Sequence, residues 1–109
     1  MAEMTLVPGT LEMLILKVVA LQPLHGFGIG QRIEQISGGV FAVNAGSLLP
    51  ALARLERSGW VTSEWRETAS HRRAKYYLLT RAGRRRLAEE ASGWEQQVAA
   101  VARILEAKS

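Results

Sequence analysis

Residues 44–79 decide the fold, and they read NAGSLLPALARLERSGWVTSEWRETASHRRAKYYLL. Asn44 is a favourable helix N-cap, and the pattern after it predicts a helix that runs to about Ser58. Two extended segments follow, 60–66 and 74–79, both rich in aromatic and β-branched residues and separated by a polar, basic turn. The stretch therefore predicts one helix followed by a β-hairpin.

The predicted helix has one apolar and one polar face. On a helical wheel the residues expected to face the core are Leu48, Leu52 and Leu55. The opposite face carries Ser47, Pro50, Ala53, Arg54 and Arg57. Trp60 and Trp65 are expected to pack the hairpin onto the helices.

Two further helices are expected upstream. The first, roughly residues 10–21 with Thr10 as its N-cap, is apolar nearly all round, so a second subunit or a long helix must cover one flank. The second begins at 24–26, and His25 is expected to cap or pack at its start. The narrow face that this helix buries is predicted to consist of Ile29, Ile33 and Ile36. Its glycines do not form a phosphate loop, because no Lys-Ser/Thr pair follows and no predicted strand precedes them.

A long last helix is predicted over roughly residues 81–107, capped by Thr80. Its apolar residues step by 4, 3, 4, 3 and 4 positions, which is a heptad seam: Leu87, Ala91, Trp94, Val98, Val101 and Leu105. The order of elements predicts a mainly α fold with a small β-hairpin. We expect a winged helix-turn-helix over 1–79 and a C-terminal dimerisation helix over 80–109, together forming one compact unit.

Positive charge is concentrated in one part of the chain. The net charge is +4, yet residues 66–86 hold eight Arg or Lys side chains against Glu67 alone, which gives +7. Such a concentration suits a surface that meets a polyanion, and a solvated basic face is the alternative. In a winged helix-turn-helix the third helix enters the major groove and the hairpin reaches the neighbouring backbone. The basic residues on these two elements are Arg54, Arg57, Arg72, Arg73 and Lys75.

Composition excludes several classes of protein. With 109 residues, 48% hydrophobic and 22% charged, the chain has room for one globular domain. It has no cysteine and no Ser/His/Asp or paired-carboxylate arrangement, so neither an enzyme nor a cofactor is expected. His25 and His71 have no carboxylate at ligand spacing, which argues against a metal site, and His71 is placed at the tip of the hairpin. The longest apolar run is too short to span a bilayer, and we expect a cytoplasmic protein without a signal peptide.

Four stretches carry a resemblance to a known family: GTL (9–11), PLHGFGI (23–29), GSLLPALARLE (46–56) and RAKYYLLTRAG (73–83). In this order and spacing they resemble the PadR family of bacterial transcription regulators, over essentially the whole chain. The length is similar to that of the short subfamily, which has a single helix after the winged domain.

The resemblance implies a homodimer that binds an imperfect inverted repeat in double-stranded DNA and most often represses. In the family the last helix packs against the first helix of the other subunit, so Leu11 and Leu14 join the heptad residues as dimerisation residues. Many members are released by a small molecule, and their targets often include efflux or detoxification genes. Trp94 would line a central cavity for a planar aromatic compound, and plain interface packing is the alternative for this residue.

Two departures from the family bear on DNA recognition, because Phe27 and Leu49 stand where the family usually has tyrosine. Leu49 retains the ability to touch a thymine methyl. The residues expected to contact DNA are Ser47, Leu49, Pro50, Arg54, Arg57, Arg72, Arg73 and Lys75. The alternative for Ser47 is a capping role, and for the two helix arginines it is solvated charge paired with Glu56 or its neighbours. The rival function is a dimeric protein-interaction or ligand-sequestering module without specific DNA binding, which would keep the seam but need no basic hairpin.

Overall fold

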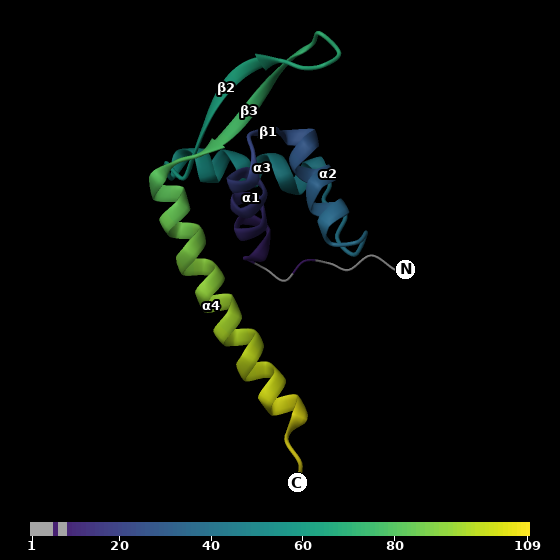
Figure 1. Ribbon diagram of the computed structural model, residues 1–109, viewed down its shortest axis with the longest axis vertical. Helices are drawn as coiled ribbons and strands as arrows, with labels where there is room; N and C mark the ends of the chain where they lie inside the picture. The colour runs from purple at the N-terminus through teal and green to yellow at the C-terminus, as the bar shows by residue number, and fades with distance from the viewer. Residues whose placement is uncertain (1–5, 7–8) are drawn as a thin grey trace.

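Three helices with a small sheet beside them form the N-terminal part of the molecule (Figure 1). The structure, a computed structural model, describes residue 6 and residues 9–109. The other residues of the expected N-terminal domain, 1–5, 7 and 8, lie outside the described part. In chain order the elements are α1 (Thr10–Leu21), β1 (Leu24–His25), α2 (Gly26–Ile36), α3 (Ala45–Arg57), β2 (Val61–Glu67), β3 (Arg73–Leu79) and α4 (Arg81–Glu106). This arrangement is the predicted winged helix-turn-helix with a long C-terminal helix.

The core lies where the first three helices meet the sheet. The leucines predicted to face it are buried, namely Leu48, Leu52 and Leu55. They pack with Ile15 and Leu16 of α1 and with Ile29 and Ile33 of α2. The expectation that Ile36 is buried is wrong, because this last residue of α2 lies outside the buried cluster and is 55% exposed.

The sheet has a third strand that the sequence does not predict. β1 pairs antiparallel with β3, with Leu24 opposite Tyr77 and His25 opposite Tyr76, so the strand order is β1-β3-β2. The sequence pattern places this region at the start of the second helix. A strand of two residues carries no periodicity of its own, and its pairing depends on partners about fifty positions away.

Side-chain caps begin α3 and α4 but not α1. Asn44 accepts a hydrogen bond from the Ser47 N–H at 2.9 Å, and Thr80 caps α4 in the same way. The prediction that Thr10 caps α1 is wrong. Gly9 occupies the cap position in a left-handed conformation (φ 88°), and Thr10 is the first residue of the helix, where it is buried.

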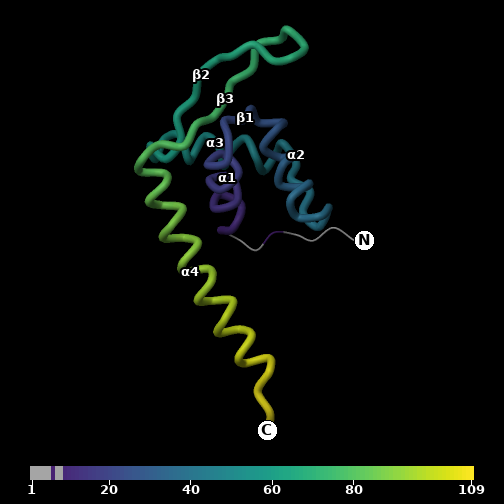
Figure 2. Tube along the Cα trace, in the orientation of Figure 1, coloured from purple at the N-terminus to yellow at the C-terminus, as the bar shows by residue number. Residues whose placement is uncertain are grey.

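α1 is covered on one flank by α4 of the same chain. Leu11 and Leu14 of α1 and Leu87 of α4 are partly buried and pack against the core. Beyond this contact α4 continues away from the rest of the molecule, as the chain trace in Figure 2 shows, and the long axis reaches 61 Å. The first part of the predicted seam thus contacts the body of its own subunit, and the remainder projects from it.

Candidate nucleic-acid interface

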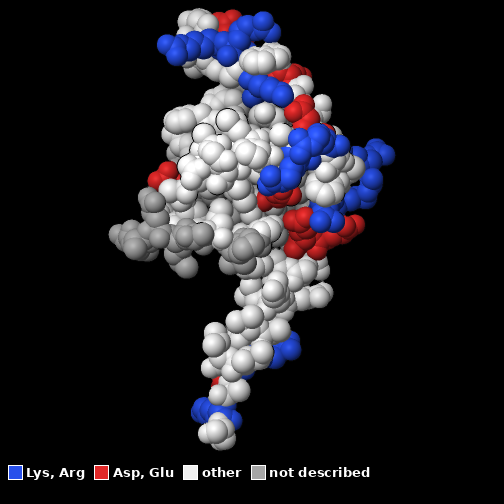
Figure 3. Space-filling view, turned by 180° about the vertical axis from the view of Figure 1, so that it is seen from behind, with Lys and Arg blue, Asp and Glu red and all other residues white. Residues whose placement is uncertain are grey.

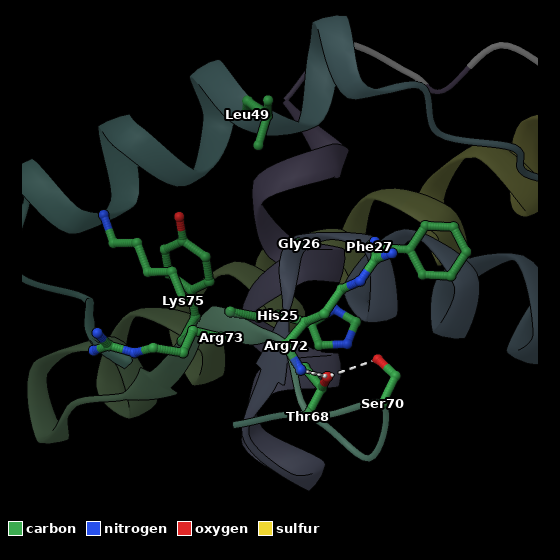
Figure 4. Close-up of a pocket in the computed structure, with 11 residues that line it drawn as sticks. His25, Gly26, Phe27, Leu49, Thr68, Ser70, Arg72, Arg73 and Lys75 are labelled. Carbon is green, nitrogen blue, oxygen red and sulfur yellow. Dashed lines mark hydrogen bonds between the residues drawn. The ribbon is translucent and has the colours of Figure 1, made fainter. Parts of the chain in front are cut away.

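A hollow of about 570 Å³ lies between α3, the start of α2 and the β2–β3 hairpin, which we call the wing (residues 61–79). Leu49 of α3 points into it from one side, and Arg72, Arg73 and Lys75 of the wing border it from the other (Figure 4). Phe27, next to the N-terminus of α2, forms its edge. The hollow is therefore bordered by residues of α2, α3 and the wing. Each residue named above is either an expected DNA contact or a position where the chain differs from the family that it resembles.

The outer face of α3, which we call the recognition face, is exposed because the leucines behind it fill the core. All five of its residues that were expected to contact DNA are exposed, namely Ser47, Leu49, Pro50, Arg54 and Arg57. The backbone N–H of Ser47 is the donor to the Asn44 cap, so the predicted capping role belongs to Asn44 and not to the serine hydroxyl. This face is the part of a helix-turn-helix that meets the major groove.

Arg54 is held by a carboxylate on another helix. Its Nε donates to Oε1 of Glu12 on α1 at 2.6 Å, and both side chains are partly exposed. The partner is therefore Glu12 and not Glu56, which the charge-pair alternative names. Within the described part of the chain Arg57 forms no ion pair, so its guanidinium is available to a ligand.

Glu56 fastens the wing to α3. Its carboxylate accepts from the Ser63 hydroxyl at 2.6 Å and from Nζ of Lys75 at 3.0 Å. The hydrogen bond from Ser63 and the neighbouring ammonium lower the pKa of Glu56, and the carboxylate in turn raises the pKa of Lys75. Lys75 lies in addition over the ring of Tyr77 at 5.5 Å. A lysine expected to contact DNA is thus tied to the recognition helix, which fixes the position of the wing.

The tip of the wing presents its two arginines to solvent. Both Arg72 and Arg73 are exposed, and the Arg73 guanidinium lies over the ring of Trp65 at 5.7 Å. Trp65 is itself 61% exposed, so the expectation that it packs the hairpin onto the helices is wrong. Trp60 does pack against the core, and Arg86 covers its ring at 4.7 Å. Trp65 lies farther along the strand, where no helix covers the hairpin, and it serves there as a platform for an arginine.

The turn of the wing is closed by short hydrogen bonds. The N–H of Thr68 donates to the carbonyl of Arg72 at 2.6 Å, and the Thr68 hydroxyl contacts that of Ser70 at 3.0 Å (Figure 4). His71 lies at the tip, as predicted, with a positive φ of 63°. Its ring is 2.7 Å from the carboxylate of Glu67, four positions earlier, so the expectation that no carboxylate is spaced to meet it is wrong. These contacts give the two arginines an ordered base.

His25 connects the sheet, the start of α2 and the hollow. Its Nδ1 accepts from the N–H of Gly28 at 3.0 Å, which confirms the predicted cap. The ring meets Tyr76 edge-on at 5.2 Å and stacks with Phe27 at 6.4 Å. The capping role was visible in the sequence, but the aromatic row was not, because Tyr76 reaches His25 only through the β1–β3 pairing.

The part of α4 that projects from the rest of the molecule carries the remaining residues of the predicted seam. Its apolar side chains are exposed, namely Trp94, Val98, Val101 and Leu105, and Ile104 is exposed beside them. Ala91 is half-buried. Trp94 borders a second hollow of about 360 Å³, which lies between α4 and the start of α1, where Thr10 and Met13 line it.

Basic side chains are concentrated on the wing and at its junction with α4. In Figure 3 the Lys and Arg side chains gather at the tip of the wing and near its junction with α4, whereas most of α4 beyond that point shows few charges. Within the described residues no group of His, Cys or acidic side chains is arranged to hold a metal ion. No helix among the described residues has the length and apolar character needed to cross a membrane.

Comparison with known proteins places this geometry among regulators. A sequence profile of the transcriptional regulator PadR-like family matches residues 15–89. A PadR family transcriptional regulator from Eggerthella lenta is 31% identical, with 92% of this chain and 85% of that chain covered and a TM-score of 0.79. A PadR-like transcription factor from Bacteroides fragilis is 29% identical, with 88% and 90% covered and a TM-score of 0.72. An uncharacterized 37.1 kDa protein in a Streptomyces fradiae transposon is 42% identical over 80 residues, and the match spans only 21% of that relative.

Proposed function

Because this chain belongs to the PadR-like family of transcriptional regulators, we propose that it is a repressor that binds an inverted-repeat operator in double-stranded DNA as a homodimer. The observation that carries the proposal is that Leu49 of the recognition face and the arginines of the wing tip border one hollow. A recognition helix in the major groove and a wing on the neighbouring phosphates would use these two surfaces together. Half-sites about one helical turn apart, or a multiple of it, are expected.

The homodimer is supported by the exposed seam of α4. Its apolar residues continue at heptad spacing beyond the contact between α4 and α1, and a second copy of the helix would cover them. We infer that residues 80–109 act mainly in dimerisation and residues 1–79 in DNA binding. The predicted dimer contacts include Leu11 and Leu14, which would meet the last helix of the partner.

We infer further that the protein is cytoplasmic, that a planar aromatic compound releases it from DNA, and that its targets are efflux or detoxification genes. The support is the hollow beside Trp94, which lies at the base of the exposed seam where a partner helix would close it. A flat molecule between two tryptophans would favour one separation of the subunits over another, and hence one spacing of the two recognition helices.

Removal of the wing arginines tests the DNA-binding proposal. Duplexes enriched from a random-core library by the wild-type chain serve as the probe, and fluorescence anisotropy over a range of salt concentrations measures the affinity. If a dimer neutralises eight phosphates, the slope of log K against log salt is about −7. Arg72→Ala with Arg73→Ala makes the slope shallower by about 0.9 for each phosphate that the variant no longer neutralises.

The matched control for this pair is Arg103→Gln with Lys108→Gln, which removes the same charge from the far end of the chain. This control leaves the slope close to that of the wild type. Equal effects of the two double variants, or a wild-type slope near zero, would contradict the proposal and favour the protein-interaction module.

A charged residue within the seam tests the homodimer. Val98→Asp places a carboxylate in the seam and is expected to shift the protein from dimer to monomer in sedimentation at micromolar concentration. Gln96→Asp adds the same charge on the outer side of α4 and leaves the dimer intact. A monomeric wild type, or a dimer that survives Val98→Asp, would refute this arrangement.

A further inference from the structure

Two large apolar side chains are exposed on the surface that we assign to DNA. Phe27 is 77% exposed and Leu49 is 56% exposed. Both line the hollow between α3 and the wing, and both line a third hollow, of about 400 Å³, beside it. Gly26 lies close to Leu49, since a methyl group placed on it would be 3.8 Å from Cδ2 of Leu49. The two exposed side chains thus border the same two hollows, and we call these residues the apolar lip (Phe27, Gly26 and Leu49).

The apolar lip is held in place and is not a loose loop. Leu49 is in the first half of α3, where the preceding residue, Leu48, is buried in the core and the following residue is the helix proline, Pro50. Phe27 stacks on His25, whose ring is fixed by its hydrogen bond to the Gly28 N–H at the start of α2. Both side chains are thus presented by helical backbone, so a contact to them requires no ordering of a loop.

The charges around the lip identify the chemistry of its occupant. Arg72 and Arg73 face it across the hollow between α3 and the wing, and no acidic side chain lines that hollow among the residues that the structure describes. In the described part of the chain, Glu34 of α2 is the one acidic side chain that lines the adjoining hollow. The occupant is therefore a polyanion that carries an apolar group at its edge. In the major groove of DNA, the C5-methyl of thymine is the methyl group that the four bases present.

We propose that the apolar lip reads a thymine in each half-site, with the thymine C5-methyl packed against Leu49 and sheltered by Phe27. The inference rests on the proposed function, since it requires α3 to lie in the major groove. The base is selected by burial of a methyl group and not by a hydrogen bond.

Deoxyuridine provides the direct test, because it differs from thymidine only by the absent methyl. The probe is a duplex enriched by the wild-type full-length chain from a random-core library, with each thymine replaced in turn by deoxyuridine in both half-sites. Burial of one methyl group corresponds to about a fourfold change in affinity, or about 15-fold for two half-sites. We expect one symmetric pair of thymines to show a loss of this size.

Variants of Leu49 connect that loss to the lip. Leu49→Ala is expected to bind the thymine and deoxyuridine duplexes equally at the sensitive position, whereas Leu49→Met keeps the difference. Ile36→Ala is the matched control, since Ile36 is 55% exposed at the end of α2 and lines neither hollow. It leaves both affinities at their wild-type values.

The outcomes of these experiments distinguish failure of the thymine readout from failure of the proposed repressor function. Tight binding with no thymine whose replacement matters, or a thymine effect that survives in Leu49→Ala, overturns the methyl readout and leaves the repressor intact. Failure to enrich any duplex overturns the repressor and the readout together. Retention of an acidic peptide or a second copy of the chain by the lip, with no preference among DNA sequences, would assign the surface to a different partner.

Discussion

Replacement of Glu12 by glutamine tests whether Arg54 reaches DNA only after it leaves a partner within its own subunit. Oε1 of Glu12 accepts from Nε of Arg54 at 2.6 Å, and the pair connects α1 to the recognition face. Partly exposed ion pairs of this kind contribute about 0.2–1 kcal/mol each. A dimer that must break two of them gains about 0.4–2 kcal/mol when they are removed, which is about a 2- to 30-fold increase in affinity. We therefore expect Glu12→Gln to bind operator DNA more tightly than the wild type.

The assay is fluorescence anisotropy with an enriched duplex at fixed salt concentration, in a double-mutant cycle with Arg54→Gln. Glu89→Gln controls for the removed negative charge, because Glu89 is an exposed carboxylate on α4 that forms no ion pair with Arg54 and lines neither hollow beside α3. The gain from Glu12→Gln should exceed that from Glu89→Gln and should disappear in the Arg54→Gln background. An equal gain in both backgrounds would show that Arg54 takes no part in DNA binding, and the reasoning would be refuted.

Three further predictions concern stability. Gly83→Ala should lower the unfolding free energy by about 1–3 kcal/mol in urea titrations, because the added Cβ would clash with the backbone carbonyl of Trp60. Gly93→Ala, at an open position of the same helix, should instead raise the unfolding free energy by up to about 1 kcal/mol. His25→Ala should cost about 0.5–2 kcal/mol because the cap of α2 is removed, and His25→Asn should recover most of it; equal losses would show that the cap is unimportant. The pKa of Glu56 is lowered by the serine hydroxyl and the lysine ammonium that donate to it, so its contribution to stability is present above pH 4.5 and is lost as the pH falls through the lowered pKa. Acid titration of Glu56→Gln should therefore show a shallower loss of stability below about pH 4.5 than the wild type, and parallel curves would argue against the link between Glu56 and the wing.

The helices and the wing were predictable because their signals are local. Asn44 and Thr80 cap helices within three residues of themselves, and the apolar faces of α3 and α4 repeat within one or two turns. β1 was missed because two residues have no period. Trp65 was misplaced because an aromatic residue in a strand predicts packing in general but does not say whether a helix lies above that part of the strand.

The residues of the candidate site were predictable from the sequence, but the ion pairs between them were not. The sequence places the arginines on α3 and the wing, since charge and element order are both visible in it. That Arg54 is held by Glu12, 42 positions away, and Lys75 by Glu56, 19 positions away, depends on how the elements pack. No spacing rule within a helix or a hairpin covers pairs at such separations. Two of the eight residues expected to contact DNA therefore have ion-pair partners inside the protein that the sequence does not reveal.

The junction between the wing and α4 leaves no space for adjustment. The N–H of Thr80 donates to the Trp60 carbonyl at 3.1 Å, its hydroxyl donates to the Gly59 carbonyl at 2.7 Å, and Gly83 lies against the same backbone. α4 therefore behaves as a rod that is held at one end. The direction in which its seam faces depends on the number of residues between that end and the seam. One extra residue between the held end and the seam would rotate the seam by about 100° and advance it by about 1.5 Å, whereas seven would restore the phase and lengthen the rod by about 10.5 Å. In the proposed dimer the length of this rod sets the distance between half-sites, so operators of different spacing would call for insertions of whole heptads.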